Sequence, residues 1–251
     1  MEVIEKGLRE VSGGDPAGAA DAGAVDGAFA LDLAPRGALH AECVVNGPVE
    51  TNTYFVCSQD ECVVIDPAWD GEKLARDFMA AHPKVRIAGL VCTHGHADHV
   101  GGVAGMRRVL GEDLPFLLSA ADERIVASSI VHQKATWGND TEDPGAPTHL
   151  LAEGDVIAFG NVRLQAFATP GHTPGGMVLF AATEGGNFAF VGDTLFPGSH
   201  GRTDLEGGDE ATILRSLAKM RRLLPADTLC LIGHGRATTM AEEVATNPFL
   251  R

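Results

Sequence analysis

The sequence predicts an α/β domain, and three observations support that prediction. The chain has 251 residues, enough for one domain with a sizeable core. Short apolar runs typical of buried strands alternate with amphipathic helical patterns. Four of the runs lead directly to histidine or aspartate beside glycine. Because open α/β sheets bind ligands at the carboxyl ends of their strands, we expect a functional site at one edge of a sheet.

The first 37 residues differ in composition from the rest of the chain. Residues 11–28 are mostly Gly, Ala and Asp, offer little to bury and show no periodicity. We expect residues 1–37 to form a flexible N-terminal extension and residues 38–251 to form the folded domain. Residues 1–10 show no basic segment followed by an apolar core, and no apolar stretch reaches membrane-spanning length. A cytoplasmic protein without a membrane partner is therefore expected.

The folded domain is predicted to begin with an antiparallel group of strands and a helix. Apolar, β-branched runs predict these strands at 41–45, 53–57 and 61–65. Asp66 ends the third run, either as a turn carboxylate or as a group that holds a ligand histidine in one tautomer. The sequence favours neither reading. Asp70 is expected to cap a helix that extends to Ala80.

The next strand leads to the densest group of potential metal ligands. The apolar run Ile87–Cys92 predicts a buried strand, and the sequence THGHADH follows it directly. Side chains of an extended segment alternate between faces, so His94 and His96 point to the same side and can bind one ion. Asp98 and His99 follow as the chain enters a helical pattern, and they can face a second point nearby. Imidazole and carboxylate together suit zinc, iron or manganese.

The middle of the domain is predicted to contain two helices and a long loop. Helices are expected at 103–110 and 120–131, on either side of a short strand at 115–118. The segment 133–147 is polar and contains Gly, Pro and Trp137. It is predicted to be a loop of the kind that often forms a lid or a binding element.

The second half of the domain repeats one pattern three times, an apolar strand followed by a potential ligand. These strands are predicted at 162–168, 188–191 and 228–232. The ligand-type residues that follow them are His172, Asp193 and His234. Glycine beside each one allows the backbone to approach an ion closely. An amphipathic helix at 210–224 is expected between the last two strands.

Charge and cysteine content restrict the possible functions. The net charge is −15 and the pI is about 5.0, which argues against tight binding to a nucleic-acid backbone. Small anionic substrates remain compatible with a local basic patch. The five cysteines form neither an even disulfide framework nor a zinc knuckle. Cys57 and Cys62 flank the predicted hairpin turn, so a cross-strand bridge is conceivable, but a core of this size needs no such link.

The motifs THGHADH, TPGHTPGG, GDTLF and GHG, in this order, resemble those of the metallo-β-lactamase superfamily. The resemblance covers residues 38–251. It implies a four-layer αβ/βα sandwich, in which two mixed sheets face each other, helices lie outside and metals bind at one edge. The run GRTD at 201–204 and the NPFL near the end of the sequence resemble those of short glyoxalase II-type hydrolases.

The resemblance also implies two metal ions, most simply zinc, with iron or manganese as alternatives. Position by position, the first metal would be bound by His94, His96 and His172, the second by Asp98, His99 and His234, and Asp193 would bridge them. Two such ions share a water and lower its pKa from ~15.7 towards ~7. The resulting hydroxide would be the nucleophile, and Asp98 would orient it or relay its proton.

A small thioester is the expected substrate, because a thiolate leaves without help from a strong acid and none is apparent. Arg202 either anchors a substrate carboxylate or pairs with Asp204, and the two readings are equally favoured. His200 lies near the metals, in the loop where long glyoxalase II enzymes usually have cysteine. Those enzymes also use a C-terminal helical region to bind glutathione, and this sequence stops before it. Weak binding of the thiol portion is therefore expected.

A single-iron persulfide dioxygenase is the alternative function. Relatives of that class keep the equivalents of His94, His172 and Asp193 as ligands, and they share the GRTD run. The ligand set is therefore compatible with both activities. A role in nucleic-acid processing is disfavoured by the acidic charge and the complete ligand set.

Overall fold

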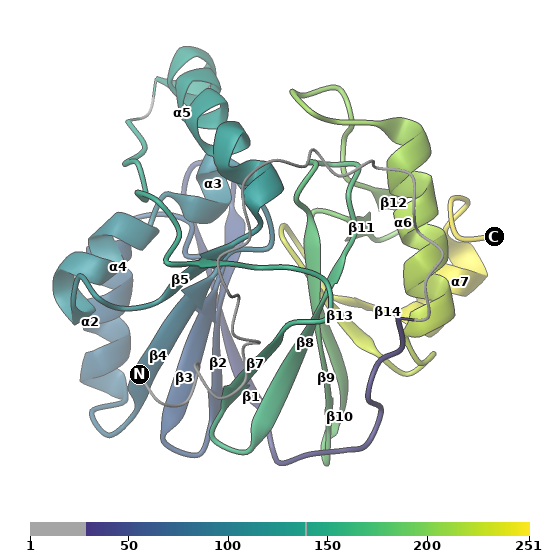
Figure 1. Cartoon of the computed structure of the whole chain (residues 1–251), viewed down its shortest axis with the longest axis horizontal. Helices are drawn as coiled ribbons and strands as arrows, with labels where there is room; N and C mark the ends of the chain where they lie inside the picture. The colour runs from purple at the N-terminus through teal and green to yellow at the C-terminus, as the bar shows by residue number, and fades with distance from the viewer. Residues whose placement is uncertain (1–28, 139) are drawn as a thin grey trace, which may run out of the picture.

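Two mixed six-stranded sheets face each other at the centre of the computed structural model, which describes residues 29–138 and 140–251 (Figure 1). The strand order is β1-β2-β3-β4-β5-β6 in the first sheet and β14-β13-β10-β9-β8-β7 in the second. Helices lie on the outer side of each sheet (Figure 1). The αβ/βα sandwich predicted from the sequence is confirmed.

The first sheet is built from the N-terminal half of the domain. Its strands are β1 (His40–Asn46), β2 (Thr51–Ser58), β3 (Glu61–Ile65), β4 (Arg86–Val91), β5 (Phe116–Leu118) and β6 (His149–Leu150). Strand β2 pairs antiparallel with both β1 and β3, and β3 to β6 are parallel. Its helices are α2 (Gly71–Ala81), α3 (Ala97–Val100), α4 (Val103–Leu110) and α5 (Glu123–Trp137), the last preceded by the short helix η1 (Ala120–Asp122). Apolar side chains of α2 and α4 pack against the outer face of this sheet.

The second sheet is built from the C-terminal half. Its strands are β7 (Val156–Phe159), β8 (Val162–Ala168), β9 (Met177–Thr183), β10 (Gly186–Gly192), β13 (Leu229–Ile232) and β14 (Thr238–Thr239). Only β10 and β13 are parallel neighbours. A small hairpin of β11 (Leu195–Phe196) and β12 (Ser199–His200) precedes the helices α6 (Glu210–Leu223) and α7 (Met240–Thr246), which cover the outer face.

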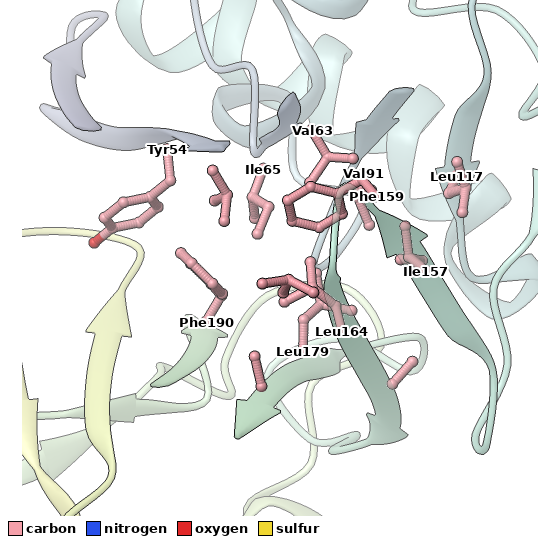
Figure 2. Packing of buried hydrophobic residues seen from close by; sticks show 14 of the residues in the cluster. Tyr54, Val63, Ile65, Val91, Leu117, Ile157, Phe159, Leu164, Leu179 and Phe190 are labelled. Atoms are coloured by element: carbon pink, nitrogen blue, oxygen red, sulfur yellow. The ribbon is translucent and has the colours of Figure 1, made fainter. Parts of the chain in front are cut away.

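The main core lies between the two sheets. Figure 2 shows side chains of the first sheet, such as Ile65 and Val91, facing side chains of the second, such as Phe159 and Leu164. The rings of Tyr54 and Phe190 meet across the interface edge to face, with centroids 5.4 Å apart. Because side chains of a strand alternate, the other faces of the same strands are free to pack against the helices. This double burial fixes the register of both sheets.

Helix α5 and the start of α2 differ in detail from the predictions. The helix predicted at 120–131 continues to Trp137, so the loop predicted to begin at 133 begins later. Gly138 ends α5 with a φ of 71°, a left-handed conformation that glycine adopts at low cost. Asp70 occupies the N-cap position of α2 as predicted, but its side chain makes no capping hydrogen bond.

Strand β9 and helix α7, each of seven residues, are the largest elements that the sequence does not predict. Strand β9 pairs with β8 and β10, and all its residues are buried. It begins directly after the glycine-rich ligand loop TPGHTPGG, where turn residues obscure the start of the apolar run.

The described part of the predicted N-terminal extension, residues 29–37, lies against the second sheet. The backbone N–H of Asp32 donates to the Gln165 side chain at 2.7 Å, and that of Arg36 donates to the carbonyl of Ala182 at 3.0 Å. Residues 1–28 of the extension lie outside the described residues. In the part of the chain that the structure describes, no helix has the length and apolarity needed to cross a bilayer.

We predict that Leu164→Ala lowers the free energy of unfolding by about 2–5 kcal/mol, because it opens a cavity between the sheets where Leu164 is fully buried. Urea denaturation of the metal-loaded protein, followed by circular dichroism, measures the change. Val45→Ala is the control, since Val45 is 59% exposed on the edge strand β1 and should change the value by less than about 0.5 kcal/mol. Equal effects of the two substitutions would contradict the packing described here.

Candidate metal centre

All seven predicted ligands converge at one edge of the sandwich. They lie in the segments that follow β4, β8, β10 and β13, with Asp98 and His99 in the short helix α3, so both sheets contribute. The ligand atoms form three overlapping groups of three, in each of which they lie within 4.8 Å of one another. The first group is His94, His96 and His172, and the second group is Asp98, His99 and His234. The remaining three, His94, His99 and Asp193, overlap both.

The first group brings three imidazole nitrogens together in a buried position. His96 Nδ1 lies 3.1 Å from His94 Nε2 and 2.9 Å from His172 Nε2. Tetrahedral zinc with bonds of about 2.0–2.1 Å separates its ligand nitrogens by roughly 3.3–3.4 Å. The three nitrogens are therefore close to the spacing that one metal ion requires.

The second group combines two imidazoles with a carboxylate. His99 Nε2 lies 3.3 Å from His234 Nε2 and 3.5 Å from Asp98 Oδ2, and His234 Nε2 lies 3.3 Å from the same oxygen. Thr51, at the start of β2, donates a hydrogen bond of 3.2 Å to Asp98 Oδ2.

Asp193 lies between the two groups. Its Oδ2 is 3.5 Å from His172 Nε2 in the first group and 3.4 Å from His234 Nε2 in the second, while Oδ1 is 3.5 Å from His99 Nε2. Oδ1 is buried and has no hydrogen-bond partner among the described residues. A Cβ at residue 233 would overlap this oxygen, so Gly233 is needed there. A buried carboxylate oxygen without a hydrogen bond, facing imidazole nitrogens, fits a bridging metal ligand.

The charges of the centre also favour cations. Burial lowers the pKa of His94 well below its ordinary value, and burial together with His172 lowers the pKa of His96 to about 3. Both imidazoles are therefore neutral and keep a lone pair for a metal. Burial opposes charge on His99 and His234 as well, but the carboxylates of Asp193 and Asp98 raise the pKa of His99 to about 9 and that of His234 to about 11. Metal binding in the second group therefore displaces protons that the carboxylates stabilise on these two imidazoles.

The comparison with protein families agrees with this geometry. Residues 46–234 match the family model described as the metallo-β-lactamase superfamily. The chain belongs to this superfamily. The matched range begins at the end of β1 and ends at the ligand His234, so it contains every ligand named above.

This metallo-β-lactamase superfamily member is similar to the following two sequence relatives and one solved structure. It is 33% identical over 205 residues to the probable metallo-hydrolase YqgX of Bacillus subtilis (strain 168), covering 81% of this chain and 94% of the relative. It is 29% identical over 193 residues to the hydroxyacylglutathione hydrolase GloC of Haemophilus influenzae (strain ATCC 51907 / DSM 11121 / KW20 / Rd), covering 76% and 88%. Among solved structures, TTHA1623 in a di-iron-bound form superimposes with a TM-score of 0.74 at 34% identity, covering 83% of this chain and 100% of that chain.

Oxygen atoms of the protein fix the orientation of four of the histidines in the superfamily site. The pairs are His94 Nδ1 with Thr93 Oγ1 at 3.1 Å, His99 Nδ1 with Asp66 Oδ2 at 3.0 Å, His172 Nδ1 with the Arg202 carbonyl at 2.7 Å and His234 Nδ1 with the Val49 carbonyl at 3.0 Å. An imidazole that donates its N–H to a carbonyl or carboxylate presents its other nitrogen, as a lone pair, to a metal. The four histidines are thus held in the tautomer that would bind a metal ion.

Asp66, for which the sequence left two readings open, faces the ligands. Besides meeting His99, its carboxylate accepts hydrogen bonds from the Thr93 backbone N–H at 2.7 Å and the Thr93 hydroxyl at 2.8 Å. It therefore connects the end of β3 to the start of the THGHADH loop.

Asp122, which the sequence analysis did not single out, connects two ligand loops. Its Oδ2 accepts from the Gly95 N–H at 2.8 Å and from the Thr173 hydroxyl at 2.7 Å, and its Oδ1 accepts from the Gly175 N–H at 2.6 Å. Gly95 lies between His94 and His96, and Thr173 follows His172, so one carboxylate holds the backbone around all three ligands of the first group. In the sequence, Asp122 precedes a helical pattern and looks like an ordinary N-terminal helix residue, and its partners are far away along the chain.

Arg202 and His200, the two predicted substrate contacts, each have a protein partner. The Arg202 guanidinium forms a two-pronged pair with Asp204, with both distances 2.7 Å. His200 Nε2 lies 3.2 Å from Glu210 Oε1, and its ring meets the Phe249 ring edge to face, with centroids 4.3 Å apart. The pairing of Arg202 with Asp204 is one of the two readings that the sequence allowed. Substrate binding by either residue stays a prediction.

We predict that Asp98→Ala and His172→Ala lose different metals. The wild-type protein should hold two ions per chain after gentle purification, and Asp98→Ala should keep only the ion of the first group. His172→Ala should lose that ion, because His94 and His96 alone leave it with two imidazoles. Elemental analysis after dialysis measures the content. Two retained ions in Asp98→Ala would contradict the assignment of Asp98 to the second group.

We also predict that Asp122→Asn weakens metal binding in the first group by about 10–100-fold, because the amide Nδ2 cannot accept the N–H groups that the carboxylate accepts. Cobalt titration in an Asp98→Ala background isolates this group. The matched control is Ser129→Ala on the same helix, since Ser129 Oγ accepts the Ala97 N–H at 2.8 Å beside the second-group ligands. Equal losses in both variants would mean that Asp122 stabilises the fold rather than the first group.

Proposed function

We propose that this metal-dependent hydrolase of the metallo-β-lactamase superfamily cleaves small thioesters in the manner of glyoxalase II, with two divalent ions. The observation that carries the proposal is Asp193, a buried carboxylate that faces both groups of ligands. The similarity to the hydroxyacylglutathione hydrolase GloC supports the thioester class. The donor set of imidazoles and carboxylates suits zinc, the metal we propose, and equally iron or manganese. The di-iron-bound TTHA1623 supports a site for two ions.

The residues of the chain have separate roles in the proposed reaction. When bound, a pair of divalent ions supplies a nucleophilic water of lowered pKa and polarises the substrate carbonyl. Burial alone would favour the neutral acid of Asp98, but His99 and His234 hold the pKa of this carboxyl well below its usual range. Asp98 is therefore a carboxylate that can orient the attacking water and accept its proton. Thr51 keeps Oδ2 of Asp98 in place.

A small recess beside the first group supports a short acyl portion of the substrate. It has a volume of about 130 Å³ and is lined by His96, Ile125, Ser128, Ser129, His132, Leu205 and Glu206. At about 30 Å³ per water in the liquid, this volume corresponds to roughly four waters. It therefore suits a small acyl group, and its lining is partly apolar and partly polar.

Arg202 is the proposed contact for an anionic part of the substrate. Its backbone carbonyl orients the ligand His172, and its guanidinium is 61% exposed. An incoming carboxylate must compete with Asp204, which lowers the expected gain in affinity. His200 is the second proposed substrate contact near the metals. We further propose that the enzyme is cytoplasmic, acts on a small molecule and requires neither nucleic acid nor a membrane.

The proposal predicts activity on 2-hydroxyacyl thioesters of a low-molecular-mass thiol and little activity on β-lactams. KM is expected to be high rather than kcat negligible, because Asp204 competes with the substrate for Arg202 and so weakens ground-state binding. One hydroxyacyl thioester, one β-lactam and one persulfide are assayed side by side, the last with an oxygen electrode. Asp98→Ala is the catalytic control and should lose most of the thioester activity.

Oxygen consumption with the persulfide, together with an inert thioester, would overturn the proposal. That outcome would assign the protein to the single-iron dioxygenases and leave His94, His172 and Asp193 as the iron ligands.

A further inference from the structure

Two cysteines lie directly opposite each other on the hairpin that joins β2 and β3. The register of the two strands pairs Cys57 with Cys62, next to the pair Ser58 and Glu61 that closes the turn. The two Sγ atoms are 2.7 Å apart. Both residues are free cysteines. The sequence alone makes a bridge here conceivable but disfavours it, because the core needs no such link.

The backbone geometry permits a bond between the two sulfurs without rearrangement. Directly opposed residues of antiparallel strands have Cα atoms about 4.5–5.5 Å apart. Disulfides span Cα separations of about 4.4–6.8 Å, so this pair lies within their range. Opposed residues also project to the same face of the sheet, so the two Sγ atoms meet on one side.

The two thiols differ in access to solvent. Cys62 is fully buried in the core between the first sheet and its helices, beside Phe55 and Val64. Cys57 packs at the margin of the same cluster and is half-buried. The hydrogen bond between the two thiols lowers the pKa of Cys57, although partial burial opposes this shift. Cys57 is thus the sulfur that a dissolved reagent can reach, and Cys62 is the sulfur placed to complete an exchange.

We propose that Cys57 and Cys62 form a redox-active dithiol that low-molecular-mass disulfides convert to a cross-strand disulfide. The Cys57 thiolate attacks one sulfur of the small disulfide and expels a thiolate, which leaves a mixed disulfide on Cys57. The Cys62 sulfur then attacks Cys57 Sγ, breaks the mixed disulfide and expels a second small thiolate. The protein loses two electrons and two protons, and one small disulfide becomes two thiols.

The dithiol is separate from the metal centre. Thr51, at the first residue of β2, bridges to the ligand His234, whereas Cys57 is near the other end of the strand. At about 3.3 Å per residue, the two positions on β2 are roughly 20 Å apart. The proposal therefore does not depend on the proposed thioesterase activity, and either can fail without the other.

Cys43 must be removed before the pair is tested. It is exposed on β1 and would form a mixed disulfide of its own with any small disulfide. Cys43→Ser is therefore the parent for all measurements. Cys92 and Cys230 are fully buried and remain as unreactive thiols in the folded protein.

The experiment treats metal-loaded Cys43→Ser protein with oxidised glutathione, blocks free thiols and measures intact and peptide masses. The expected product is lighter by two hydrogen atoms and carries no glutathione, and the change lies in the tryptic peptide 37–73. Dithiothreitol should restore the original mass. A stable glutathione adduct on Cys57, or an unchanged mass, would overturn the proposal.

Two further substitutions in this background test the order of events. Cys62→Ser should accumulate one glutathione on Cys57, because nothing remains to displace it. Cys57→Ser should react with oxidised glutathione at least about ten-fold more slowly, because Cys62 is buried. Equal adduct formation in both variants would contradict the assigned roles. Circular dichroism and metal content, unchanged in both, show that the variants are folded.

Discussion

The metal centre depends on a carboxylate, Asp193, placed among imidazoles where water scarcely reaches. Only 11% of its side chain is exposed, and its two oxygens face ligand nitrogens from both groups. Burial favours the neutral acid, yet His99 and the other imidazoles hold the pKa of Asp193 below its ordinary value. A buried anion is stable only when cations or hydrogen bonds compensate it. Protons on His99 and His234 do so in part, and two metal ions would do so completely.

Backbone hydrogen bonds between the two sheets hold the ligands around Asp193. The Met177 N–H of the second sheet donates to the Thr93 carbonyl of the first at 2.8 Å, and the Asn52 N–H of the first donates to the Gly233 carbonyl of the second at 2.7 Å. Thr93 and Gly233 each adjoin a ligand histidine. These bonds, each worth about 0.5–1.5 kcal/mol, cost little in chain entropy because the core between the sheets already fixes the strands. The hydrogen bonds that join the two sheets therefore also fix the backbone beside the histidines of the centre.

The sequence groups the candidate ligands correctly in space because each one follows closely after a strand end. His94, for example, follows an apolar run directly, and glycine marks the turn beside it. The alternation of side chains in an extended segment was enough to predict that His94 and His96 face the same point, and their nitrogens lie 3.1 Å apart. Groups that act across the chain escaped the same reasoning. Asp122 meets the backbone at residues 95 and 175, and only the folded sheets bring those positions together.

Elements were missed for the same physical reason. β9 gains its strand structure by pairing on both sides with β8 and β10, a tertiary contact that local propensity does not contain. The end of α5 was misplaced because polar residues were read as a loop, although an exposed helix accepts them equally well. The hairpin that carries Cys57 and Cys62 was predicted from the sequence. The strand register that places the two thiols opposite each other is known only from the structure.

The two halves of the centre differ in exposure, and this difference bears on the chemistry. His94, His96 and His172 are 2%, 7% and 5% exposed. In the second group His99 is fully buried, but the side chains of Asp98 and His234 are 22% and 25% exposed. Loss of an ion from the second group leaves groups that water can solvate. Loss of an ion from the first group leaves three buried imidazole nitrogens without a metal ion between them. A protein with one ion should therefore keep it in the first group, beside Asp193. Two-metal hydrolysis and single-metal chemistry share that half, so Asp98 and His234, in the exposed half, are the residues that separate them.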